Sequence, residues 1–295
     1  MDIKGLLGLL PFFLSATLAL ACALTYKVMH QRRARRSPLA DRQIGHVPGQ
    51  QLVQRVSDHE GEMLLAVMLM YMAFPLMFMA WVGIHIDLSN LDWGGTEWTF
   101  LIAAMLLFGY GMWSYIRHLH LRDNIRDGLL AERVTGMQLN RLVAHGCLVL
   151  HDLPCEGFNI DHVVIAPRGV YAVETKSFRK PKNKPANAPA KVKLDGNALV
   201  FEDFVTAKPV EQSRRQAQWL ARCLHESLKE PVPVSPAIAL PGWYVDKEGA
   251  KPSDVFAFTP MGRGYEWFTY GEEIIPPAKR SLIAQALATK YPTIS

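Results

Sequence analysis

The segment GFNIDHVVIAPRGVYAVETKSF combines apolar stretches with acidic and basic side chains whose spacing could support chemistry. The two apolar stretches predict strands that are joined by a turn. If the turn uses the four residues 166–169, Asp161 lies directly opposite Glu174. Because side chains alternate along a strand, Asp161, Glu174 and Lys176 are expected on one face of this hairpin.

Two carboxylates that face each other across a sheet repel and destabilise it unless something neutralises them. A hard divalent cation such as Mg²⁺ would do so, because it prefers oxygen ligands. The chemistry that needs two acids beside a lysine is metal-assisted hydrolysis of a phosphodiester. Lys176 would orient or activate the attacking water, or contact the phosphate. The alternative is an ion pair at the surface between Lys176 and either acid, which contributes little.

Glu132 is a third acid of interest, because it falls on an apolar helical stripe with Leu129 and Leu139. Removing a carboxylate from water is costly, so Glu132 needs a metal or a basic partner. Otherwise it lies at the edge of the stripe and extends its carboxylate into solvent.

The elements around these residues predict an α/β or α+β fold, in which a mixed sheet is flanked by helices. Gly146 suits the end of the first helix, and Pro209 suits the first turn of the second. The expected order is helix 123–145, strands 147–152, 158–166 and 170–177, a hairpin at 191–204 turning at Asp195-Gly196, helix 209–229, strands 237–245 and 255–259, and helix 278–290.

A helical Glu, a strand Asp and a following Glu-x-Lys, in this order, resemble the PD-(D/E)xK nuclease superfamily. Within it, three stretches look like the nuclease-related domain, NERD, over about residues 126–240: DGLLAERVTGMQLNRL, GFNIDHVVIAPRGVYAVETKSF and KPVEQSRRQAQWL. The resemblance implies a restriction-endonuclease-like core with Mg²⁺ or Mn²⁺ at Asp161 and Glu174. It implies Lys176 as the catalytic lysine and Glu132 as an accessory acid that supports the metal.

The resemblance also places Gln212 at the site, although an exposed polar position on a helix explains this glutamine equally well. The sequence departs from the family pattern at two points. Ala131 stands where a glycine usually precedes the helical glutamate, and the Lys- and Pro-rich stretch after Ser177 is longer than expected. Neither departure removes a catalytic group.

Three stretches without charged side chains precede this domain, at about residues 6–26, 63–86 and 98–116. A helix needs about 20 apolar residues to cross a bilayer, so each stretch predicts a transmembrane helix. The expected organisation is a membrane region over residues 1–121 and a soluble domain over residues 122–295. Cleavage of the first stretch as a signal peptide is the alternative, with the small residues around Cys22 as the cleavage site.

The distribution of basic residues predicts how these helices are oriented. Seven Lys or Arg residues follow the first stretch, and three Arg residues follow the third. The only charged residues in the loop after the second stretch are acidic. Positively charged loops stay in the cytoplasm, which predicts a multi-pass inner-membrane protein whose C-terminal domain is cytoplasmic.

Nucleic acid, with DNA favoured, is the expected partner besides the lipid bilayer. Residues 176–193 contain seven basic side chains and no acid, and Arg214, Arg215 and Arg222 follow on the next helix. Such charges could neutralise phosphates without reading sequence. They could also form a solvated surface or attract anionic lipids.

The leading hypothesis is a membrane-anchored, metal-dependent nuclease that acts on DNA or RNA. The main alternative is a module without catalysis, which binds nucleic acid or protein at the membrane. A scaffold whose helices carry the function is less favoured, because the predicted spans hold no Asp, Glu, Lys or Arg for a transport path. A structural zinc site is also disfavoured, because no cysteine pair has CxxC spacing.

Overall fold

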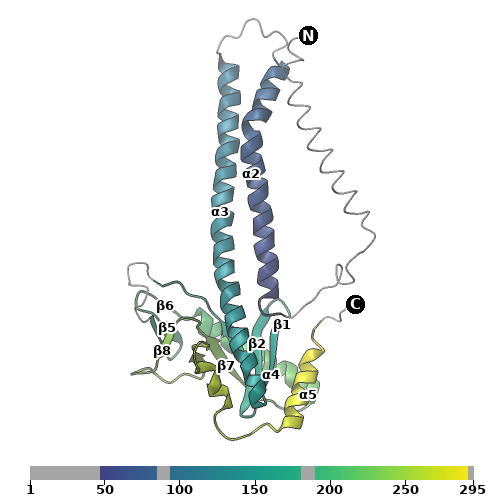
Figure 1. Ribbon diagram of the computed structural model, residues 1–295, viewed down its shortest axis with the longest axis vertical. Helices are drawn as coiled ribbons and strands as arrows, with labels where there is room; N and C mark the ends of the chain where they lie inside the picture. The colour runs from purple at the N-terminus through teal and green to yellow at the C-terminus, as the bar shows by residue number, and fades with distance from the viewer. Residues whose placement is uncertain (1–46, 85–93, 181–189, 292–295) are drawn as a thin grey trace. The chain divides into compact units, whose positions relative to one another are not determined.

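The computed structural model describes residues 47–84, 94–180 and 190–291 (Figure 1). The chain divides into two compact units, with a boundary after Leu119. The described stretch before Glu60 belongs to the second, C-terminal unit. The first predicted span, residues 6–26, and the loop residues 181–189 lie outside the described residues.

Two long helices contain residues 63–84 of the second predicted span and all of the third, and residues 85–86 lie outside the described residues. Helix α2 covers Gln50–Ile84 and continues through Pro75, and α3 covers Gly95–Asn140. The sequence predicted a separate helix beginning at Asp123, but α3 is a single helix. No glycine or proline lies between Gly111 and Gly128, so nothing in the backbone ends the helix where the apolar stretch stops.

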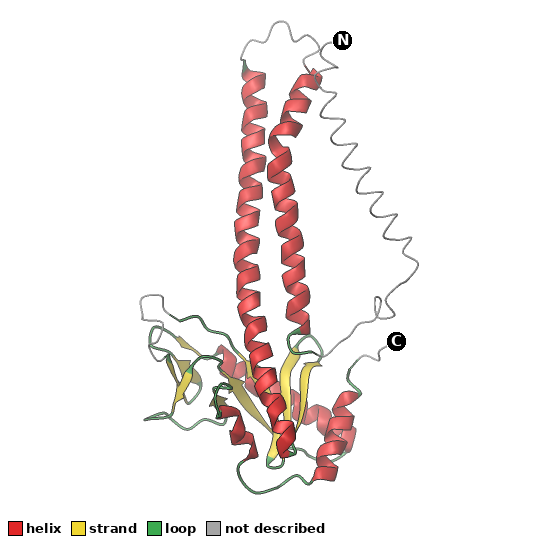
Figure 2. Cartoon of the chain, in the orientation of Figure 1, coloured by secondary structure: helices red, strands yellow, loops and turns green. Residues whose placement is uncertain are grey.

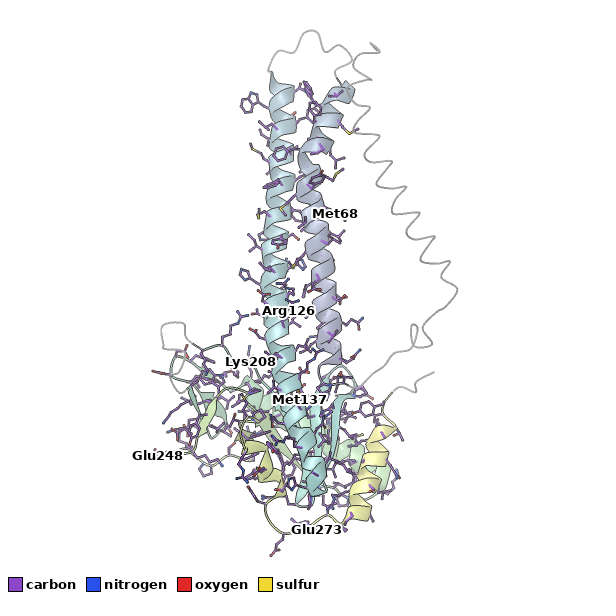
Figure 3. The ribbon with its side chains drawn as sticks, viewed as in Figure 1. Met68, Arg126, Met137, Lys208, Glu248 and Glu273 are labelled. Carbon is purple, nitrogen blue, oxygen red and sulfur yellow. The ribbon has the colours of Figure 1, made fainter. Side chains whose placement is uncertain are left out.

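Both helices are long and apolar enough to cross a membrane, by length and composition. Only 17% of the most apolar window of α2 and 11% of that of α3 is buried, whereas a core helix of a soluble protein would be mostly buried. Exposed side chains include Met68, labelled in Figure 3, Tyr71 and Leu106. Gly111 packs so closely on Met70 that a Cβ there would lie 2.6 Å from its Cγ.

The strands are drawn in yellow in Figure 2. The main sheet has five strands in the order β1-β2-β3-β7-β9. The strands are β1 (Leu148–Pro154), β2 (Asn159–Ala166), β3 (Gly169–Thr175), β7 (Val234–Ala239) and β9 (Phe256–Phe258). The first three pair antiparallel, and β3, β7 and β9 pair parallel. The sheet is therefore mixed, as predicted.

Successive side chains of β2 point to opposite faces of this sheet, and both faces are buried. Val163 and Ile165 belong to one core, which includes residues of α4 (Lys208–Leu228) and α5 (Pro277–Ala288). Val164 and Ala166 belong to the other, which includes the end of α3 and the 3-10 helices η1 (Arg141–His145) and η2 (Gly264–Thr269). Both faces are covered, so β2 reads as a continuous apolar run.

A second sheet was not predicted. It has the order β6-β5-β4-β8, with strands β4 (Lys191–Asp195), β5 (Ala198–Val200), β6 (Val205–Thr206) and β8 (Tyr244–Asp246). The predicted hairpin at Asp195-Gly196 is present. The predicted strand 237–245 was wrong, because the chain turns at Pro241-Gly242, with Gly242 at φ 80°, and passes from β7 into this sheet as β8.

Candidate functional site

The hairpin of β2 and β3 sets the positions of the first two acids. Ile165 pairs with Val170, and the ladder continues to His162 and Val173. Asp161 and Glu174 are the next residues in this register, as the four-residue turn predicted. The Asp161 Oδ2 atom accepts a 2.7 Å hydrogen bond from the Thr175 backbone N–H. Both acids lie on the face of the sheet that α4 covers.

Glu174 is almost fully buried, with 2% of the residue exposed. Its Oε1 atom lies 2.5 Å from the Lys176 ammonium nitrogen and accepts a 2.8 Å hydrogen bond from Gln212. The Glu174 side chain is 3% exposed and that of Lys176 is 30% exposed, so this ion pair does not lie on the open surface. The structure thus brings Glu174, Lys176 and Gln212 into direct contact.

Gln216 also bonds Glu174 and was missed by the sequence analysis. Its Nε2 atom donates to the other Glu174 oxygen, Oε2, at 2.5 Å, and lies 3.3 Å from the Asn159 carbonyl oxygen. Gln216 is 2% exposed. The signal that could have found it is its spacing, since a residue four positions after Gln212 lies on the same side of a helix.

Glu132 is half-buried on α3, and Gly49 lies close to it. Gly49, at φ 77°, allows this close approach, because a Cβ there would lie 2.4 Å from Leu129 and 3.4 Å from Glu132 Oε2. Burial, followed by the negative charges of Asp152 and Glu174, raises the pKa of Glu132 to about 7. The carboxyl group is therefore held away from solvent, unlike an acid at the edge of an exposed stripe.

The pKa of Asp161 is also raised well above its usual value. Burial is the main cause, and the negative charges of Glu174 and Glu132 add to it. The Thr175 N–H and the Lys176 ammonium act in the opposite direction. The negative charge of Glu174 therefore raises the pKa of both Glu132 and Asp161, so these three acids share one electrostatic environment.

Asp152 is a further acid near this environment that the sequence did not single out. It interrupts β1 with a left-handed backbone at φ 48°, which is uncommon for residues other than glycine. Its carboxylate accepts a 2.5 Å hydrogen bond from the Asn159 side-chain amide. Aspartate tolerates this backbone conformation better than most residues, and the hydrogen bond fixes it there.

A pair of neutral histidines lies on the opposite face of the same strands. The Nδ1 atoms of His151 and His162 lie 2.9 Å apart, and His151 Nε2 lies 2.9 Å from the Asn140 side-chain oxygen. Burial lowers the pKa of His151 to about 4, and burial with the neighbouring His151 lowers the pKa of His162 well below its usual value. These rings therefore bring no positive charge to offset the acids at neutral pH.

Several of the predicted basic residues are paired with acids. Arg179 pairs with Asp127 at 2.7 Å, and Lys191 pairs with Asp246 at 3.3 Å. The Arg214 guanidinium bonds the Asp254 carboxylate through Nε at 3.0 Å. Arg215 and Arg222 remain exposed and have no ion pair with any described residue.

The donor set suits a hard cation. The three predicted ligands, Asp161, Glu174 and Glu132, offer only oxygen atoms, and a bound positive charge would relieve their mutual repulsion. However, within the described residues no three His, Cys, Asp or Glu side chains are grouped closely enough to hold a metal ion. In this structure the Glu174 oxygens bond Lys176 and the two glutamines instead.

A mixed sheet covered by helices, with opposed acids and a lysine at the end of one hairpin, fits an α/β nuclease-like core. Residues 127–241 match the family model of the nuclease-related domain, and this part of the chain is a NERD domain. The sequence placed its limits at about 126 and 240. Searches of curated proteins and of solved structures found no significant match to the chain.

Proposed function

We propose that the protein is a metal-dependent nuclease anchored in a membrane. The observation that carries the proposal is the contact between the Lys176 ammonium nitrogen and Glu174 Oε1, at 2.5 Å. Glu174 lies on β3, which pairs with β2, the strand of Asp161. The NERD match supports nuclease-related chemistry and does not by itself establish turnover.

In this proposal Asp161 and Glu174 would hold Mg²⁺ or Mn²⁺, and Glu132 would support the metal. The metal, when bound, lowers the pKa of a water molecule and stabilises charge on the phosphate. Lys176 donates hydrogen bonds to the water or the phosphate. Gln212 and Gln216 fix the orientation of the Glu174 carboxylate.

The test uses the full-length protein in detergent micelles, with end-labelled DNA and RNA and added Mg²⁺. Lys176→Ala should abolish cleavage, whereas Lys247→Ala, which removes an exposed lysine near Phe256 in the other core, should cleave like the wild type. Thermal unfolding of each variant checks that it folds. Equal cleavage by the two variants would contradict the assignment of Lys176.

A second candidate function is a nucleic-acid-binding module without catalysis. The specific observation in its favour is that both Glu174 oxygens already accept hydrogen bonds from protein groups. If the wild type binds DNA or RNA but cleaves neither with Mg²⁺ nor with Mn²⁺, the module is the better description.

The membrane part of the proposal rests on α2 and the apolar half of α3. Their apolar side chains are exposed, and a bilayer is the environment that would cover them. We place the NERD domain in the cytoplasm, because the Arg residues that follow the third apolar stretch should remain there. Reporter fusions at the C-terminus test this orientation, and a signal from an extracytoplasmic reporter would reverse it.

A further inference from the structure

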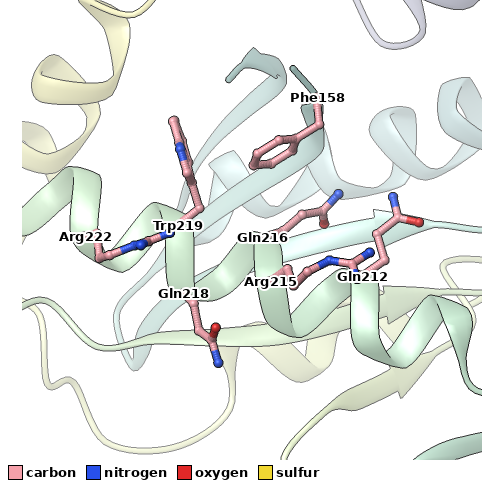
Figure 4. Close-up of a pocket in the computed structure, with 7 residues that line it drawn as sticks. All are labelled: Phe158, Gln212, Arg215, Gln216, Gln218, Trp219 and Arg222. Atoms are coloured by element: carbon pink, nitrogen blue, oxygen red, sulfur yellow. The ribbon is translucent and has the colours of Figure 1, made fainter. Parts of the chain in front are cut away.

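A pocket of about 430 Å³ lies beside the middle of α4, next to the proposed site (Figure 4). This volume is within the range of pockets that hold small organic groups. The residues that line it include Gln212, Gln216, Arg215, Arg222, Trp219 and Phe158. Gln212 and Gln216 also bond Glu174 directly, so a ligand in this pocket would be separated from Glu174 only by these two glutamine side chains.

An aromatic pair forms one wall of the pocket. Phe158, just before β2, and Trp219, on α4, meet edge to face with ring centroids 5.6 Å apart. Phe158 is 37% exposed, so it presents a ring to solvent. Trp219 also packs against the core under α4, which holds its ring in place. A fixed aromatic surface of this kind is a platform on which a nucleobase stacks.

Two arginines give the pocket a positive charge. Arg215 and Arg222 are seven residues apart on α4, which corresponds to two turns and about 10.5 Å of helix. Neighbouring Arg214 is held by Asp254, whereas Arg215 and Arg222 have no ion pair with any described residue. No acidic side chain lines the pocket. These two guanidinium groups are thus available for an anion.

A further polar atom in this region has no partner. The Oε1 atom of Gln216 is buried and accepts no hydrogen bond from any described residue. Its amide nitrogen already donates to Glu174. The remaining oxygen can accept a hydrogen bond from a ligand, and a nucleobase N–H group, such as the N3–H of thymine, is a donor of the required kind.

We propose that this pocket binds a nucleotide of a single-stranded nucleic acid next to the cleavage site. The base stacks on Trp219 and meets the Phe158 ring edge to face, and the backbone phosphates lie along Arg215 and Arg222. Bases of a duplex are stacked within the helix and cannot enter an aromatic pocket unless they are extruded. The inference rests on the proposed nuclease function and names single-stranded nucleic acid as the substrate class of that nuclease. Binding to the pocket can be measured separately from cleavage.

The experiment measures binding of a fluorescein-labelled dT oligonucleotide, and of the corresponding dA–dT duplex, to the full-length protein in detergent. Ca²⁺ replaces Mg²⁺, because Ca²⁺ accepts oxygen ligands without the strict octahedral geometry of Mg²⁺. The variants are Trp219→Leu, Trp219→Phe and the double change Arg215→Gln/Arg222→Gln. The matched control is Arg141→Gln/Lys247→Gln, which removes the same charge from exposed residues near the other core.

We expect the single strand to bind more tightly than the duplex. Trp219→Leu should weaken single-strand binding about tenfold, and Trp219→Phe should retain most of it. The double arginine variant should reduce the slope of log affinity against log salt by about 1.4, which corresponds to two lost phosphate contacts. A duplex preference, or a slope equal to that of the control, would overturn the proposal. Normal binding by a folded Trp219→Leu variant would also overturn it.

The same variants separate this inference from the proposed function. Pocket-dependent binding without cleavage in Mg²⁺ would overturn the nuclease proposal and support the pocket. Cleavage of single strands that is unaffected by the Trp219 and arginine changes would overturn the pocket and support the nuclease. Loss of binding and cleavage together in the pocket variants, with both normal in the control, supports the two proposals.

Discussion

The Glu132→Gln substitution should stabilise the metal-free protein at alkaline pH. The pKa of Glu132 rises from a usual 4.5 to about 7 in the folded chain, mainly because of burial. A carboxyl group with a raised pKa favours folding while it is protonated. Its contribution is complete below about pH 4.5 and is lost as the pH rises through 7.

The size of the effect follows from the two pKa values. A difference of about 2.5 corresponds to about 3.4 kcal/mol, and partial exposure of Glu132 reduces this to roughly 2–3 kcal/mol. Glutamine keeps the shape and cannot ionise, so the variant avoids this loss at pH 8. For a domain of this size, we expect its melting temperature to rise by about 4–12 °C.

The assay is thermal unfolding of the full-length protein in detergent with EDTA, at pH 5 and pH 8. Wild type and Glu132→Gln should differ little at pH 5 and clearly at pH 8. Glu156→Gln, an exposed position, is the control and should match the wild type at both. If Glu132→Gln melts at or below the wild-type temperature at pH 8, the burial of a strained acid at this position is refuted.

Three further substitutions test other parts of the domain. Lys229→Gly should stabilise it by about 1 kcal/mol in denaturant titration, because Lys229 ends α4 with a left-handed backbone at φ 59°. Gly264→Ala should prevent folding or cost more than about 3 kcal/mol, since a Cβ would lie 2.0 Å from the Thr259 carbonyl oxygen; soluble, fully stable protein would contradict this. Gln216→Leu should cost about 1.5–3 kcal/mol by removing a donor from buried Glu174, and a thermal unfolding midpoint equal to that of wild type would argue against that contact.

The hairpin was predictable because local rules fix it. Apolar alternation, a short turn and the period of two place Asp161 opposite Glu174 without knowledge of the rest of the chain. The same holds for the end of the first helical region, where Gly146 adopts φ 78°. Both results depend only on residues close in sequence.

Contacts between distant segments were not predictable in the same way. Gln216 reaches Glu174 across 42 positions, and helical periodicity alone could not show which sheet face α4 would cover. The Pro241-Gly242 turn was visible in the sequence but was read as part of a strand, because Ala237 to Val245 is otherwise apolar. Asp152 was not singled out, because nothing in the neighbouring sequence indicates its left-handed backbone.

The order of these segments along the chain also has a consequence for biosynthesis. Asp161 and Glu174 lie on a hairpin that closes through local contacts, and such contacts form early. The glutamines that bond Glu174 lie on α4, after the second sheet has begun, and so leave the ribosome later. Until α4 docks, Glu174 is solvated by water. We therefore expect the docking of α4 to be the folding step that dehydrates this acid.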